Sequence, residues 1–185
     1  IAGYARSPFT LAKKGELAVT IEAWDRHEVL RAAALAQELG LKGALRGAPL
    51  AGDANVVAAL HAAKLGVILG PYAADQTRAS LESLMRLAAA GVPVGFAIDA
   101  PWRSAHELRL SAARAMAAGA PRDAAWRALT SDAAQLAGVG ELLGELAPGR
   151  EADLVLWSGD PLDLSSRVEA VYVDGARAWP TAGKH

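Results

Sequence analysis

Asp99 is the residue of this sequence whose position most favours chemistry. It ends an alternating stretch in which Val92, Val94, Phe96 and Ile98 are bulky and the residues between them are mostly small. A two-residue period of this kind predicts a β-strand with one apolar face. A carboxylate at the carboxyl end of such a strand can bind a divalent cation or accept a proton from water. The small neighbours leave room there for a ligand.

Three other side chains could act with Asp99. Glu22 lies near the end of an earlier predicted strand, where its carboxylate could bind a metal as an oxygen donor. Trp102 could line a substrate pocket, and His106 falls in the first turn of the next predicted helix, where it could contact substrate. Each also has a plain structural interpretation, such as a salt bridge between Glu22 and Arg46 or packing of Trp102 over a loop.

Four strand–helix units must position these residues. Each predicted strand is followed by a predicted helix, which indicates βαβ units and a parallel sheet. Four units fit either the second half of a (β/α)₈ TIM-type barrel or a doubly wound open sheet, and both put ligands at the carboxyl ends of the strands. The predicted strands are 17–23, 41–47, 66–71 and 92–99, and the predicted helices are 25–40, 53–65, 74–91 and 104–119.

Capping residues mark the ends of these helices. Asp25 precedes Glu28 by three residues and Ser104 precedes Glu107 by three, which is the spacing of a capping box. Gly40 stands where a helix ends in the left-handed conformation that glycine adopts without strain. Helix boundaries are therefore predicted at both ends of 25–40 and at the start of 104–119.

The alternation of predicted strands and helices ends after residue 120. Two further helices are predicted over 121–130 and 131–140, and the alternating stretches that follow have no helix between them. Strands connected in this way pair antiparallel, and Asp174-Gly175 is a strong two-residue hairpin signal. We expect residues 1–142 to form the parallel α/β unit and residues 143–185 to form strands of a small β-sandwich.

Composition excludes several classes of protein. The 185 residues carry 19 basic and 20 acidic side chains, so the chain has no excess of positive charge that would favour binding to nucleic acid or to an acidic membrane surface. The absence of cysteine excludes disulfides and cysteine-bound metals and fits a cytoplasmic location. No apolar run approaches the length of a membrane span. Because the sequence opens without an initiator methionine or a signal-peptide pattern, we expect a fragment of a longer protein.

About fifty residues near the carboxyl end carry motifs in a definite order. A helix ends at a threonine, a short helix closes on a glycine, and a Gly-x-Leu-x-x-Gly turn precedes Ala-Asp-Leu-Val and a strand with Asp-Gly. This order resembles the carboxyl end of the amidohydrolase superfamily, nearest its imidazolonepropionase-like and dihydroorotase-like members. Residues 87–101 resemble, more loosely, the stretch that leads into the family's eighth barrel strand. The positions that match are Thr130, Gly138, Gly144, Leu146, Gly149, Ala152, Asp153, Leu154, Asp160, Pro161 and Gly175.

The resemblance implies that residues 17–142 are the second half of a (β/α)₈ barrel, and that the last strands complete a sandwich with an amino-terminal segment. In this family, the aspartate that ends the eighth strand binds a divalent metal and takes a proton from the metal-bound water. Asp99 matches that position. The resemblance therefore implies a hydrolase that uses a divalent metal, with zinc as the first expectation, and acts on a non-peptide C–N bond of a small or cyclic amide.

Two positions depart from the family's pattern. Family members usually place a histidine at the end of the fifth strand and another at the end of the sixth. This sequence has Glu22 at the first of these positions, and Arg46 and Gly47 in the region of the second. One alternative is therefore a degenerate member, without metal or catalysis, that serves binding or structure. A complete small doubly wound protein is another.

The expected partners follow from the half-barrel. A half-barrel leaves two open sheet edges, so we expect a homo-oligomer or association with the missing amino-terminal half. The substrate is expected to be a small molecule, with no nucleic-acid or membrane partner. The longer parent is expected to be an enzyme, and this chain alone to be inactive. His27 and His61 are expected on helix surfaces.

Overall fold

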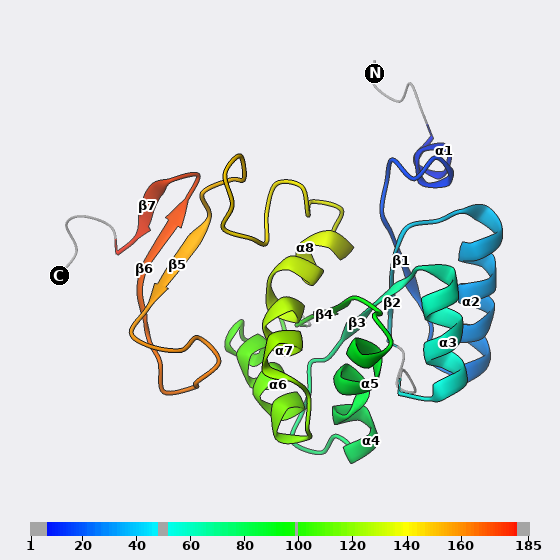
Figure 1. The fold of residues 1–185 in the computed structure, drawn as a ribbon, viewed down its shortest axis with the longest axis horizontal. Coiled ribbons are helices and arrows are strands. Elements are labelled where there is room, and N and C mark those ends of the chain that lie inside the picture. The colour runs from blue at the N-terminus through cyan, green and yellow to red at the C-terminus, as the bar shows by residue number, and fades with distance from the viewer. Residues whose placement is uncertain (1–6, 48–51, 99, 181–185) are drawn as a thin grey trace.

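A computed structural model describes residues 7–47, 52–98 and 100–180, and shows a mixed α/β fold with two separate sheets (Figure 1). One sheet is parallel and the other is antiparallel, as the sequence predicts. Within the described ranges, no helix has both the length and the apolar character needed to cross a membrane.

The parallel sheet contains four strands in the order in which they occur along the chain. All three pairs of neighbours run parallel, which confirms the four predicted strand–helix units. The order contains no reversal, whereas a doubly wound sheet reverses its strand order at the point where ligands bind. The strands are β1 (Val19–Glu22), β2 (Gly43–Arg46), β3 (Gly66–Leu69) and β4 (Val94–Phe96).

The helices follow these strands and continue after the last one. The Asp25 carboxylate accepts the Glu28 amide at 2.9 Å, and the chain leaves that helix at Gly40 with a φ of 65°, as predicted. The Glu28 carboxylate accepts the Trp24 amide at 2.7 Å. Among the described residues, the helices are α1 (Pro8–Lys13), α2 (Arg26–Leu39), α3 (Ala54–Ala63), α4 (Arg78–Leu81), α5 (Ser83–Ala89), α6 (His106–Ala117), α7 (Arg122–Leu129) and α8 (Ser131–Leu136).

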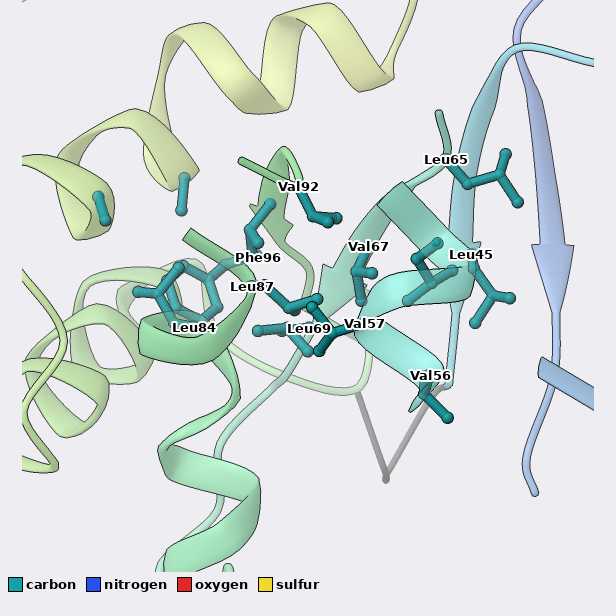
Figure 2. Close-up of a cluster of buried hydrophobic side chains, with 14 of the residues drawn as sticks. Leu45, Val56, Val57, Leu65, Val67, Leu69, Leu84, Leu87, Val92 and Phe96 are labelled. Atoms are coloured by element: carbon teal, nitrogen blue, oxygen red, sulfur yellow. The ribbon is translucent and has the colours of Figure 1, made fainter. Parts of the chain in front are cut away.

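One face of the parallel sheet carries the core. Ile21, Leu45, Val67 and Val94 lie in register across the four strands, and the last three are buried. Helices α2, α3, α5, α6 and α7 contribute many of the other buried residues, and Figure 2 shows side chains of α3 and α5 against the strands. Burial of each leucine or valine contributes about 1.5–3 kcal/mol, so this face fixes which way each strand is turned.

Helix α8 packs against the opposite face. Gly66 lies on that face, and a Cβ at this position would stand 2.1 Å from Leu136 Cδ2. Gly95, two positions farther on in register, faces Ala133 and Leu136 at ordinary contact distance. Glycine at position 66 therefore allows α8 to approach β3 closely, whereas a Cβ at position 95 would fit against α8. On β1 this face stays open, because Thr20 and Glu22 are exposed.

The antiparallel sheet contains β5 (Leu154–Trp157), β6 (Val168–Val173) and β7 (Ala176–Trp179), paired in that order. Asp174 and Gly175 connect the last two strands with φ angles of 49° and 73°. Two residues with positive φ form the turn whose twist matches a hairpin. The Asp174-Gly175 hairpin is therefore confirmed, and the predicted boundary between residues 142 and 143 stays a prediction.

Arg109 of α6 fastens the loop between β5 and β6. Its guanidinium donates to the carbonyl oxygens of Pro161 at 2.7 Å, Asp163 at 2.5 Å and Ser166 at 3.3 Å. It also lies 4.4 Å from the centroid of the Trp157 ring. Arg122 of α7 also pairs with Asp160 of this loop at 2.5 Å, and Leu162 is buried in the core, so Arg109 is one of several residues that hold the loop against the helices.

Two helix predictions need correction. The helix predicted over 74–91 is divided into α4 and α5 at Glu82, whose carboxylate is bound by Arg78 and Arg86. The capping box at Ser104 does not form, because the Glu107 carboxylate accepts Arg103 at 2.9 Å and the helix begins at His106.

Candidate functional site

The carboxyl ends of the parallel strands bring one row of residues together. Glu22, Arg46, Ile68 and Gly95 are in register across the four strands. Because side chains alternate along a strand, this row lies on the face opposite the buried core residues. The row offers one carboxylate, one guanidinium, one hydrocarbon side chain and one position without a side chain.

Glu22 and Arg46 form an ion pair in this row. The Arg46 Nη1 lies 3.2 Å from the Glu22 Oε1, and the two side chains are 34% and 55% exposed, respectively. This pairing confirms the structural interpretation of Glu22, and its role as a metal ligand stays a prediction. In the part of the chain that the structure describes, no three histidine, cysteine, aspartate or glutamate side chains form a group that could hold a metal.

Trp24 is a residue at this edge that the sequence analysis missed. Its ring is close to Gly47, where a Cβ would stand 3.1 Å from two ring atoms. Gly47 also has a φ of 88°, a conformation that favours glycine. Trp24 is 62% exposed, so its indole could offer a surface to a ligand beside the Glu22–Arg46 pair. An aromatic residue directly after a predicted strand was the available signal.

The segment after β3 is held firmly near the same edge by Tyr72. Its amide donates to the Ser111 Oγ at 3.0 Å, its carbonyl accepts Arg114, and its hydroxyl donates to the Ser80 carbonyl at 2.9 Å. The ring meets Phe96 edge to face, with centroids 5.6 Å apart. Burial raises the pKa of the Tyr72 phenol well above its usual range, so it stays protonated. Tyr72 is therefore a structural anchor.

The remaining predicted site residues lie in or near the connection from β4 to α6. Asp99 is outside the described residues, so its predicted roles in metal binding and proton transfer stay predictions. Trp102 is 87% exposed, and His106 is exposed at the first position of α6. Their predicted contact with substrate also remains untested. His27 and His61 are exposed on α2 and α3, as expected.

Two shallow hollows lie elsewhere, between helices. One, of about 510 Å³, is lined by Val57, His61 and Arg86, and another, of about 360 Å³, is lined by Leu81 and Arg114. Neither is lined by a predicted site residue. The row at the carboxyl end of the sheet therefore remains the candidate site.

Comparison with known proteins identifies the family. The model of the family described as "Amidohydrolase family" matches residues 15–178, which is most of the chain. The chain belongs to the amidohydrolase family. This confirms the resemblance on which the sequence analysis depends.

Three individual proteins are similar to this chain over different shares of their length. Amidohydrolase tasK of Hapsidospora irregularis is 35% identical over 77 residues, which are 42% of this chain and 8% of that protein. The crystal structure of an amidohydrolase from Thermotoga maritima is 27% identical, with a TM-score of 0.79 over 92% of this chain and 45% of that one. A Xaa-Pro dipeptidase with bound methionine, 17% identical, has a TM-score of 0.70 over 91% of this chain and 46% of its own. At that identity the likeness concerns the fold alone. The chain thus spans less than half the length of these proteins.

Proposed function

We propose that this chain is the second half of a (β/α)₈ barrel in a longer amidohydrolase, with its antiparallel strands belonging to a composite β-sandwich. The strand order of the parallel sheet supports this proposal, because a barrel continues its strands in sequence order. The coverage of 45% of the Thermotoga maritima structure also supports it. Residues 1–142 would form the half-barrel and residues 143–185 the sandwich strands.

The whole enzyme would hydrolyse a C–N bond other than a peptide bond in a small or cyclic amide. Water would add to the amide carbon, and the C–N bond would break as the nitrogen leaves with a proton. Asp99, three residues after β4, would accept the proton of the attacking water. Trp102 follows it in the same connection and His106 begins α6, and both would contact the substrate. The match of the family model to residues 15–178 supports the hydrolase class, and the restriction to non-peptide bonds follows from the resemblance in the sequence.

Amidohydrolase family members are generally metal-dependent, so zinc is the expected cofactor of the whole enzyme. A zinc site needs three or four nitrogen, oxygen or sulfur ligands. The described residues do not fit such a site, since the row at the strand ends contains one carboxylate and that carboxylate is paired with Arg46. Any zinc would depend on Asp99 and on ligands from the other half of the barrel.

A panel of substrates tests the reaction class. The full-length protein that contains this chain would be incubated with N-acyl amino acids, lactams, hydantoins and cyclic ureides, and the released amine or acid would be measured. Hydrolysis of one class, lost in the Asp99→Asn variant but kept in Asp123→Asn, would support the proposal. Hydrolysis that is equal in both variants would contradict the role of Asp99.

A second candidate function is a degenerate family member that binds a partner or ligand without catalysis. The Glu22–Arg46 ion pair favours it, because histidines usually stand in this region in the family. Absence of hydrolysis across the panel, together with absence of bound metal in the full-length protein, would favour this candidate over the enzyme.

Association through the open edges of the sheet is also proposed. Strands β1 and β4 each have one neighbour within the described sheet, so their outer edges can pair with strands of the missing half or of a second copy. Size measurement of this chain in dilute solution tests the proposal. A stable, well-folded monomer would contradict it.

A further inference from the structure

We infer that the carboxyl ends of β1 and β2 form a metal-independent part of this site, in which the Glu22–Arg46 ion pair takes the place of metal ligands. The inference rests on the proposed function only in treating the carboxyl end of the parallel sheet as the site. It goes beyond that function because it separates these two strands from whatever metal the other half of the barrel binds.

The first argument concerns the number of donors. The four residues in register at the strand ends are Glu22, Arg46, Ile68 and Gly95. Only Glu22 has an atom that can ligate a metal, because an arginine side chain has no acceptor and the other two offer nothing. One carboxylate falls short of the three or four ligands of a zinc site. These residues of β1 to β4 therefore cannot form such a site among themselves.

The second argument concerns charge. The guanidinium of Arg46 is permanently positive, and its Nη1 lies 3.2 Å from the Glu22 Oε1. A dication that approached this oxygen would meet a fixed positive charge a few ångströms away. It would also compete with an existing charge-assisted contact for the same lone pairs. Both effects lower the affinity of Glu22 for a cation.

The third argument is that the backbone itself does not forbid a metal. Glu22 and Arg46 are direct neighbours on adjacent parallel strands, whose backbones are about 4.8 Å apart, and they point to the same face. Two imidazoles at these positions would converge on one point above the sheet. The side-chain types, and not the backbone, therefore account for the lack of ligands here. Two imidazoles, with water completing the coordination, should raise the affinity of this edge for zinc.

Zinc binding by the full 185-residue chain tests the inference without any substrate. Zinc retained after desalting and the shift of the unfolding temperature with added ZnCl₂ would be measured for four proteins. These are the wild type, Glu22→Gln, the double variant Glu22→His/Arg46→His, and the control Glu22→Gln/Arg46→Met, which removes both charges and supplies no imidazole. Circular dichroism would establish that each variant is folded.

The wild type, Glu22→Gln and the control should show the same zinc-dependent shift, because Glu22 makes no bond to the metal. The double-histidine variant should bind zinc at least tenfold more tightly than the wild type. If the wild type retained zinc and Glu22→Gln lost it, the inference would be overturned. A folded double-histidine variant with no more zinc affinity than the wild type would also count against it. If the double-histidine variant does not fold, the comparison of the wild type with Glu22→Gln still decides the matter. Failure of the substrate panel would leave all these results unchanged, so the two proposals fail separately.

Discussion

Replacing Arg109 with alanine should loosen the loop between β5 and β6 from α6, although Arg122 would still pair with Asp160 and Leu162 would stay buried. The guanidinium makes three hydrogen bonds to carbonyl oxygens, between 2.5 and 3.3 Å, and a cation–π contact with Trp157 at 4.4 Å. A hydrogen bond to a charged group contributes about 1.5–3 kcal/mol, and a partly exposed cation–π contact about 0.5–1 kcal/mol. Because the residue is half-buried, water can replace part of these contacts in the variant. We therefore expect a loss of about 2–4 kcal/mol in the free energy of unfolding, below the sum of the separate contacts.

Urea unfolding followed by circular dichroism measures this loss, and hydrogen exchange locates it. The amides of residues 158–167 should exchange faster in Arg109→Ala, while those of β2 and β3 should change little. Arg109→Lys should recover only part of the stability, since an ammonium cannot reproduce a planar fork of donors. Arg78→Ala, which removes an exposed pair with Glu82, is the matched control and should cost about 0.5 kcal/mol or less. A loss of only about 0.5 kcal/mol or less in the free energy of unfolding of Arg109→Ala would refute the reasoning.

Two further predictions concern the core. Tyr72→Phe removes the hydrogen bond to the Ser80 carbonyl and should cost about 1 kcal/mol near neutral pH. Because burial raises the Tyr72 pKa in the folded state, the wild type should lose stability above about pH 10, by about 1.4 kcal/mol per pH unit more than the variant. Urea unfolding at about pH 8 and pH 11 measures the difference, and parallel losses would contradict it. Gly66→Ala places a Cβ 2.1 Å from Leu136 Cδ2 and 2.9 Å from the Pro93 carbonyl oxygen, and should destabilise by about 1–3 kcal/mol. Gly95→Ala, with contacts of 3.5 Å, should cost far less. Equal melting temperatures for the two glycine variants would contradict the difference in crowding between these positions.

Local patterns predicted much of this fold, because the signals that determine it lie within a few residues of one another. The alternation of bulky and small residues located β4, and Asp25 and Gly40 marked the two ends of α2. The capping prediction at Ser104 failed because the Glu107 carboxylate, which a capping box requires, accepts a hydrogen bond from Arg103 instead.

The contacts that position the site were harder to predict, because they join distant residues. The Glu22–Arg46 pair could be anticipated, since residues 24 apart in consecutive parallel strands come into register. Arg109 could not, because its three acceptors lie more than fifty residues away in a loop that has no periodic pattern. Trp24 was missed because the sequence alone does not distinguish an exposed aromatic residue after a strand from one that packs over a loop.

The most direct test of the proposed hydrolase is the rate of amide hydrolysis by the full-length protein with Asp99 replaced by asparagine. The substitution keeps the size of the side chain and removes its capacity to accept a proton. With a substrate found in the panel, we predict that kcat/KM falls by about 10²–10⁴, the usual contribution of a general base, while the unfolding temperature stays unchanged. An Asp99→Asn enzyme that retains the wild-type rate would contradict the account.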